Sequence, residues 1–148
     1  MTHVRQQIRE VVTAAVTGLS TTGARVFQSR VYPLEEADLP GLLVYSQSEP
    51  AAPATINTPR FLDRTYTLIV QAVAAATLAL DDELDAICQE VEAALANPLA
   101  SLLSLARVIT LTGTEFDLQG TAEQPVGTAT MTFEVAYSTA EGAPDTAL

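Results

Sequence analysis

Apolar positions follow two different periods along the chain, and the period separates helices from strands. Over residues 4–19 they recur every three to four residues, which predicts an amphipathic helix capped by Thr2. The same spacing returns over residues 80–96 and predicts a second helix that ends at Asn97. Two helices of similar plan are therefore expected, one in each half of the chain.

The remaining apolar residues alternate with polar ones or form short continuous runs, as in strands. The predicted strands cover residues 25–32, 42–47, 61–73, 107–118 and 128–138. In the fourth strand, Ile109 and Leu111 stand in one phase, whereas Phe116 and Leu118 stand in the other. A change of phase beside Gly113 predicts a β-bulge there.

The order of elements, α-β-β-β-α-β-β, predicts an α+β fold. We expect a mixed or antiparallel sheet of about five strands with two main helices packed on one face. Residues 1–138 are expected to form a single α+β domain with a proline-rich loop at residues 48–60, followed by a flexible C-terminal tail at residues 139–148. A proline-rich loop of this length in a compact domain is usually functional or disordered.

Composition and charge narrow the class of protein. The 148 residues are 48% hydrophobic, enough for a packed core, and the formal net charge is −11 with arginine as the only cation. A protein that binds DNA needs a row of basic side chains to neutralise the phosphates, and this chain has no such row. The acids either keep the surface soluble or form a surface past which DNA slides without sticking.

Nothing in the sequence predicts a membrane segment or a disulfide. The longest apolar stretch, residues 68–80, falls well short of a membrane helix, and no signal-peptide pattern opens the chain. The one cysteine, Cys88, excludes an intrachain disulfide. We therefore expect a soluble protein of a reducing compartment, with no membrane contact.

Candidate chemistry is sparse. His3 is the only histidine and stands in the first turn of a helix, while Cys88 falls on the apolar face of the second helix. The acidic run at residues 81–85 opens a helix, where carboxylates complement the helix dipole, and so is better explained as capping than as a metal site. Glu115 and Asp117 are better explained as solvated edge charges than as an acid–base pair. We expect no catalytic residue, no cofactor and no metal.

The order and character of several blocks resemble the tail terminator proteins of long-tailed phages, the minor tail protein U class. The resemblance spans residues 3 to about 138 and includes an N-terminal amphipathic helix and an acidic second helix. The other blocks are Arg25-Val26-Phe27, Arg30-Val31-Tyr32-Pro33-Leu34, Leu39-Pro40-Gly41-Leu42-Leu43-Val44-Tyr45, Arg64-x-Tyr66-x-Leu68, Leu111-Thr112-Gly113-Thr114-Glu115-Phe116, Pro125-Val126-Gly127 and Phe133-Glu134-Val135-Ala136-Tyr137.

The resemblance implies a non-enzymatic structural protein of the virion, assembled in the host cytoplasm and located at the head-proximal end of the tail. In that family a homo-hexameric ring caps the tail tube and stops its polymerisation. The implied partners are the chain itself, the major tail tube protein and a head-completion or connector protein, with DNA passing through the lumen.

Other functions remain open at this point. A neck or tail-completion ring subunit shares the fold, the tube protein itself is another structural candidate, and a small ligand-binding α+β domain is a candidate from a different class. As subunit or tube interface we predict the proline-rich loop, with Arg60 or Arg64 pairing with acids of a neighbour. A solvated arginine at a strand edge is an equally good explanation. The candidate interface residues are Pro50, Pro53, Pro59, Arg60 and Arg64.

Overall fold

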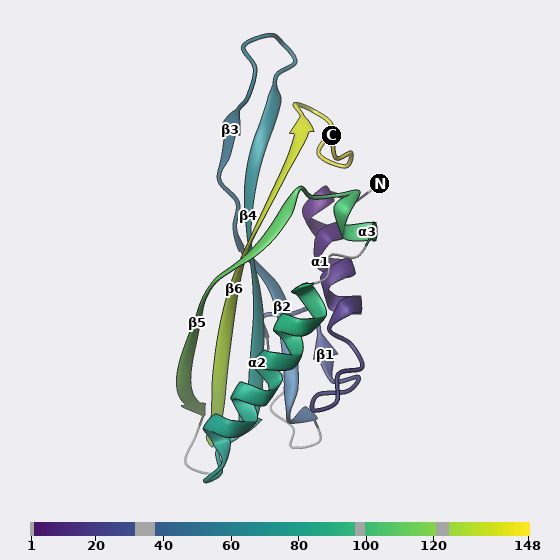
Figure 1. The fold of residues 1–148 in the computed structure, drawn as a ribbon. Helices are drawn as coiled ribbons and strands as arrows, with labels where there is room; N and C mark the ends of the chain where they lie inside the picture. The colour runs from purple at the N-terminus through teal and green to yellow at the C-terminus, as the bar shows by residue number, and fades with distance from the viewer. Residues whose placement is uncertain (1, 32–37, 97–99, 121–124) are drawn as a thin grey trace.

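The protein is a helix-covered sheet, described by a computed structural model at residues 2–31, 38–96, 100–120 and 125–148. Figure 1 shows the helices on one side of a long, twisted sheet, which confirms the expected α+β class. The elements are α1 (Val4–Ala15), β1 (Val26–Phe27), β2 (Gly41–Ser48), β3 (Ala51–Pro53), β4 (Phe61–Ala75), α2 (Leu80–Ala96), α3 (Ala100–Leu103), β5 (Val108–Gly120) and β6 (Pro125–Ala140).

The sheet is mixed and has six strands. Its order is β1-β2-β4-β6-β5, and the short β3 pairs with β4 beyond the point where β2 ends. The pair β1–β2 is parallel, whereas all other pairs are antiparallel. The central pair is β4–β6, whose ladder runs along all fifteen residues of β4.

The core lies between one face of this sheet and the helices. Strand alternation places Leu68 of β4 and Met131 of β6 on that face, and the helical period turns Ile8 of α1 and Ile87 of α2 towards them. All four side chains are fully or almost fully buried. The opposite face is more polar, with a small second cluster whose buried members are Leu43, Val73 and Val126.

The bulge predicted in the fourth strand is confirmed. Leu111 pairs with Phe133 and Gly113 pairs with Thr132, so one extra residue, Thr112, stands in β5. The extra residue shifts the alternation by one, because side chains change face at every step of a strand. Ile109, Leu111, Phe116 and Leu118 consequently all lie on the helix side of the sheet.

The first helix and the first strand differ in detail from the prediction. The N-cap of α1 is His3 rather than Thr2: the His3 Nδ1 accepts a hydrogen bond from the Arg5 backbone nitrogen at 3.2 Å. Within the described residues the first strand is only β1, and residues 28–31 do not extend it. The Arg30 guanidinium donates to the Ser46 carbonyl of β2 and so occupies an acceptor on the edge of β2.

Part of the predicted proline-rich loop is regular structure. Ser48 is the last residue of β2, and Ala51–Pro53 forms β3. Proline lacks a donor but keeps its carbonyl, and the Pro50 carbonyl accepts from the Thr65 nitrogen at 3.0 Å. The loop expected at residues 48–60 is therefore a β-hairpin, with residues 54–60 as its connection.

The C-terminal residues are placed differently from the expected loose tail. Thr139 and Ala140 belong to β6, and Thr139 forms a β-bridge with Ala147. The Leu148 nitrogen donates to the Ser138 carbonyl at 2.9 Å, and the Val4 nitrogen donates to the Pro144 carbonyl at 2.8 Å. These backbone bonds fold residues 141–148 back beside the start of α1.

Candidate functional site: a hairpin arm and an apolar groove

A β-hairpin arm, residues 51–62, projects from one end of the sheet past the helices (Figure 1). It consists of β3, the connecting residues 54–60 and the first two residues of β4. The Ala54 nitrogen donates to the Phe61 carbonyl at 2.7 Å, and the Phe61 nitrogen donates to Thr55 Oγ1 at 3.0 Å. These bonds join the two sides of the hairpin, and its β4 residues, Phe61 and Leu62, also pair with β6. No helix covers the arm (Figure 1).

The arm is exposed and carries little charge. Residues 51–61 are all exposed except Thr55, and residues 50–59 contain no charged side chain. At the tip, Ile56 is 97% exposed, and Phe61 near the base is 45% exposed. Because the Ile56 side chain stays in water, its apolar surface adds almost nothing to the stability of the fold.

A network of ion pairs and hydrogen bonds around one buried carboxylate anchors the base of the arm. The Glu49 carboxylate, whose side chain is only 6% exposed, accepts from Arg5 of α1 at 2.7 Å and from Arg64 of β4 at 2.9 Å. The Tyr137 hydroxyl of β6 donates to its other oxygen. Burial, together with this bond to Glu49, raises the pKa of the Tyr137 phenol, so the phenol remains a donor. Three segments of the chain, α1, β4 and β6, are thereby bonded to one carboxylate.

Sequence reasoning missed this network, although one signal for it was present. Arg64 stands two residues before Tyr66 in β4 and so occupies the core phase of the strand, where a charge requires a partner. Its side chain is 12% exposed, and its Nε also donates to Thr139 Oγ1 at 3.0 Å. Which acid meets it depends on the turn after β2, and that turn is not readable from periodicity.

The structure separates the predicted interface residues into two groups. Pro50, Pro53, Pro59 and Arg60 are exposed on the arm or at its base, whereas Arg64 belongs to the buried network. Arg60 already pairs within the chain, because its Nη2 donates to Glu141 at 2.9 Å and its backbone nitrogen donates to the same carboxylate at 3.0 Å. This bond lowers the pKa of Glu141 and raises that of Arg60.

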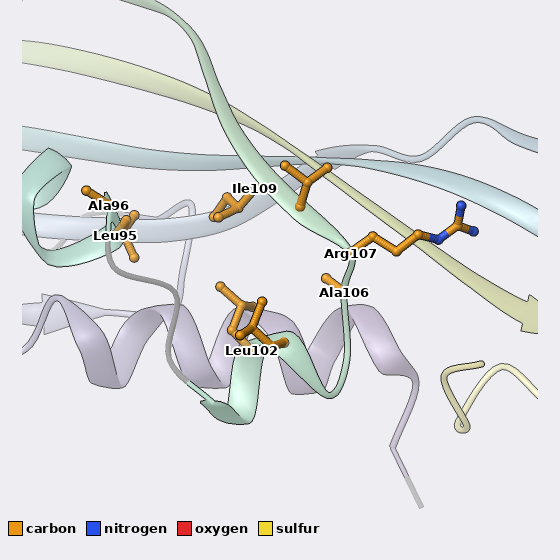
Figure 2. Close-up of a pocket in the computed structure, with 8 residues that line it drawn as sticks. Leu95, Ala96, Leu102, Ala106, Arg107 and Ile109 are labelled. Carbon is orange, nitrogen blue, oxygen red and sulfur yellow. The ribbon is translucent and has the colours of Figure 1, made fainter.

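An apolar groove lies between the end of α2, α3 and the start of β5 (Figure 2). A cavity of about 170 Å³ adjoins a second of about 210 Å³, and the two share Leu95, Ala96 and Ile109. In Figure 2 the side chains of Leu95, Leu102 and Ile109 converge, while the Arg107 guanidinium points away from them. The other lining residues are Glu92, Leu103, Ala106, Val108, Leu111 and Phe133.

Charges are unevenly distributed over the molecule. The arginines bind within the chain: four form ion pairs, with Glu49, Glu141 or Asp63, and the other three bind Gln28, the Ser46 hydroxyl or backbone carbonyls. The acids of α2, by contrast, form no ion pair with any described residue; they are Asp81, Asp82, Glu83, Asp85, Glu90 and Glu92. Glu90 accepts hydrogen bonds from Thr21 instead. The solvent side of α2 is therefore strongly acidic.

The other candidate residues have structural surroundings. Cys88 is 7% exposed on the core side of α2, and burial, reinforced by Asp85 and Glu92, raises its pKa to about 11. Glu115 and Asp117 are exposed and pair in register with Thr130 and Thr128 on the sheet face away from the helices. Across the described ranges, no three His, Cys, Asp or Glu side chains lie close enough to hold a metal ion. No helix in the described part of the chain is both long and apolar enough to cross a membrane.

Comparisons with known proteins found similar chains among the solved structures. Neither protein-family models nor curated proteins match the chain. Among solved structures, a chain of the "Virion of native gene transfer agent (GTA) particle" is similar, with 20% sequence identity and a TM-score of 0.48. The alignment covers 90% of this chain and 92% of that chain.

Proposed function

We propose that this protein is a structural component of a phage-type virion, and specifically the tail terminator. In this proposal it forms a homo-hexameric ring on the head-proximal end of the tail tube, stops tube polymerisation and joins the tail to a head-completion or connector protein. Its action consists of binding and assembly, without catalysis or a cofactor.

The single observation that carries the proposal is the exposed hairpin arm. A closed ring needs two different surfaces on each subunit, because its interface is heterologous. The arm supplies one such surface: residues 54–60 lie beyond the helix-covered core, and the Glu49 network holds the base of the arm in place. An anchored arm whose tip carries no charge is well suited to contact with another subunit.

The resemblance of the sequence blocks to tail terminators supports the same function. Within the described residues, the blocks fall on β1, β2, β4, β5 and β6 and on the approaches to these strands. These strands form the sheet from which the arm extends, and β5 and β6 contribute residues to the groove. The match covers the framework of the fold rather than one isolated motif.

The charge distribution supports the proposal that DNA passes through the ring. A channel that lets DNA pass must not replace the counterions of the phosphates, so acidic or neutral walls suit it. The unpaired acids of α2 can supply such a wall. The arginines, which are engaged within the chain, leave no basic stripe among the described residues.

The alternatives predict different assemblies. A neck ring of the same fold would bind a head connector but not free tube ends, and a tube protein would polymerise alone into long tubes. A ligand-binding domain requires convergent polar groups in a pocket, whereas the groove residues of α2, α3 and β5 are mainly apolar. No observation favours the ligand-binding alternative.

Imaging of the purified protein with and without tail tubes tests the proposal. We expect light scattering and electron microscopy to show six-fold rings, either free or bound at tube ends, and we expect added protein to stop the growth of tubes. A protein that leaves tube growth unchanged and binds no tube end is not a terminator. Long tubes formed by this protein alone would identify the tube subunit instead.

A further inference from the structure

We propose that residues 28–31 of one copy pair with the open edge of β5 in a second copy of this chain, so that the sheet of one subunit continues into the sheet of the next. The receiving part of β5 is the stretch after its bulge, residues 113–118. This inference rests on the proposed ring function, because it identifies the two lateral surfaces by which ring subunits meet.

The outer edge of β5 is a free sheet edge. β5 is the last strand of the sheet and pairs with β6 on one side, and no strand of the described residues lies on its other side. The strand is 13 residues long and contains neither proline nor lysine, which commonly protect an edge. Residues 115–118 are all exposed. An edge of this kind accepts an extended segment through backbone hydrogen bonds.

A segment at the opposite edge of the sheet has the sequence of a strand but no strand partner. The alternation over residues 25–32 predicts a strand, yet β1 ends at Phe27, and residues 28–31 pair with no described strand. The Val31 nitrogen donates to a nearby side chain, Ser29 Oγ, at 3.0 Å, and the Val31 side chain is 76% exposed. A segment that is able to form a strand therefore lies at the surface beside the sheet edge.

The side chains of the segment and of β5 match on both faces of the proposed pair. In β5, Phe116 is 53% exposed and Leu118 is 65% exposed; both lie on the helix side of the sheet, whereas Glu115 lies on the other side. Neighbouring residues of a strand point to opposite faces. An added strand that places Val31 beside the two apolar residues consequently places Arg30 on the side of Glu115. Apolar and opposite-charge pairs of this kind stabilise neighbouring strands.

The charges of the two edges are opposite. Residues 11–34 contain two arginines and no acid, whereas residues 108–148 contain six acids and no cation. Arg30 donates to the Ser46 carbonyl, which is a neutral acceptor, and Glu115 forms no ion pair with a described residue. A guanidinium has five donors, so Arg30 can bind a carboxylate while it keeps the Ser46 carbonyl. Opposite charges guide the two edges together and favour this orientation of the subunits.

The two edges lie too far apart to meet within one molecule. β1 and β5 are the first and last strands in the sheet order, and Figure 1 shows them on opposite sides of the molecule. The register also places them level with each other, because one row of paired residues crosses the whole sheet. This row is Val26, Leu42, Ala72, Ala129 and Phe116. A second copy placed beside the sheet therefore brings the receiving part of β5 close to the residues that follow β1.

These observations favour a second copy as the partner of the β5 edge. The segment that matches this edge on both faces belongs to the same chain and lies at the edge that a neighbouring copy presents. Because the two edges differ, the contact is heterologous and repeats from subunit to subunit until a ring closes.

Disulfide trapping between differently tagged copies tests the contact. One full-length preparation carries Val31→Cys and the other carries Leu118→Cys; they are mixed, assembled alone and on tail tubes, and oxidised gently. The matched control replaces Leu118→Cys with Leu103→Cys, because Leu103 is 56% exposed and lies in α3, near the opposite end of β5 (Figure 1). The natural Cys88 is buried and remains in every variant. We expect interchain disulfides with the Leu118 variant, located by peptide mass spectrometry, and about tenfold fewer with the Leu103 variant.

Charge reversal gives a second measurement that needs no cysteine. Arg30→Glu and Glu115→Arg should each reduce the fraction of protein in rings by about tenfold, and the double variant should recover most of it. Asp82→Arg is the control, because Asp82 is an exposed acid of α2 away from both edges, and it should leave ring formation unchanged. Arg30→Glu also loses the Ser46 bond, so thermal unfolding is recorded for each variant. The Glu115→Arg variant and the disulfide yields decide the test if Arg30→Glu unfolds.

The outcomes separate the edge contact from the ring proposal. Equal disulfide yields for the Leu118 and Leu103 variants in protein that forms rings would overturn the edge contact, and the ring proposal would stand. Disulfides between Val31→Cys and Leu118→Cys in protein that never caps tubes would support the contact and overturn the terminator proposal. Disulfides only between two Leu118→Cys copies would replace the heterologous contact with a two-fold pairing of β5 strands. Trapping of Leu118→Cys only to a tube protein would overturn the choice of a second copy.

Discussion

A single strand, β4, passes through two regions of the molecule that share one hydrogen-bonded backbone ladder but differ in burial. From Tyr66 to Ala74 its residues are buried or half-buried between neighbouring strands and helices. From Phe61 to Thr65 the same strand is exposed or half-exposed, apart from the Arg64 side chain, and pairs with β3 on one side and β6 on the other. The hydrogen-bonded ladder continues without a break, whereas the helical cover does not.

The difference separates two kinds of requirement on the sequence. In the body, the apolar residues of β4 stabilise the fold through burial, which is proportional to the area removed from water. In the arm, Ile56 contributes little to folding because it is 97% exposed, and Phe61, at 45% exposed, contributes less than a buried aromatic residue would. We therefore expect the exposed apolar residues of the arm to contribute to binding another molecule. Substitutions in the body should mainly change stability, and substitutions in the arm should mainly change association.

The largest expected effect comes from deleting a core side chain of β4. Leu68→Ala should reduce the free energy of unfolding by about 2–5 kcal/mol, because Leu68 is fully buried between sheet and helices. Leu62→Ala is the matched control in the same strand and on the same face, and it should cost less than about 1 kcal/mol. Urea unfolding of the two variants measures both values.

Similar losses at Leu62 and Leu68 would show that the arm packs as firmly as the body. The contrast between the two regions of β4 would then be wrong. A loss confined to Leu68 sharpens it and leaves the arm free to serve assembly.

The anchor of the arm is expected to show the next largest effect. Glu49→Ala leaves Arg64, whose side chain is 12% exposed, and the Tyr137 hydroxyl without their shared acceptor. Removing one partner of a buried charged bond costs about 1–3 kcal/mol. Glu141→Ala breaks the exposed pair with Arg60 and should have a much smaller effect. Equal losses in the two variants, measured by urea unfolding, would contradict a special role for the buried network.

The helices and most strands could be predicted from the sequence because periodicity reports burial. The bounds of α2 and the bulge beside Gly113 were both predicted, since a buried stripe and a phase change leave direct traces in the pattern. The strand predicted at residues 25–32 was too long. Its alternation resembles a strand, but Arg30 binds the edge of β2 in place of a backbone donor.

The arm and its anchor could be predicted only in part. The proline-rich composition marked residues 48–60 as unusual, but short strands such as β3 have no core-facing residues and therefore no period to detect. The network joins Arg5, Glu49, Arg64 and Tyr137, which are distant in the sequence and meet only through the sheet. Contacts between residues so far apart in the sequence depend on the order of the strands in the sheet. The periodicity of the sequence does not determine that order.

A smaller effect of opposite sign is expected from a buried hydroxyl in the body. Thr128 is 3% exposed, and its Oγ1 has no hydrogen-bond partner among the described residues. Thr128→Val removes this unsatisfied group with little change of shape, so the free energy of unfolding should rise by about 1 kcal/mol. Thr65→Val is the exposed control in the arm-side part of β4 and should change it by less than about 0.5 kcal/mol. Loss of stability in Thr128→Val would indicate a partner for the hydroxyl, such as an ordered water.

The smallest expected effect is a dependence on pH at the junction of arm and body. Burial and the charge of Arg5 lower the pKa of His3 from its ordinary value of 6.5; Arg64 lowers it further, and Glu49 opposes them. A lowered pKa in the folded state means that the unfolded chain takes up the proton first. The contribution of His3 to stability should therefore be complete above pH 6.5 and decline as the pH falls through the folded-state pKa.

His3→Asn isolates this contribution, because asparagine is a good N-cap and does not titrate. His3 is the only histidine, and the groups with lowered carboxyl pKa values, Asp63 and Glu141, act in a more acidic range. The midpoint temperature of thermal unfolding should fall slightly between pH 7.5 and about 5 in the original protein. In the variant the same midpoint should change less over this pH range. Parallel profiles would show that the protonation of His3 does not affect the junction, and the anchor of the arm would then depend on Glu49 and its partners alone.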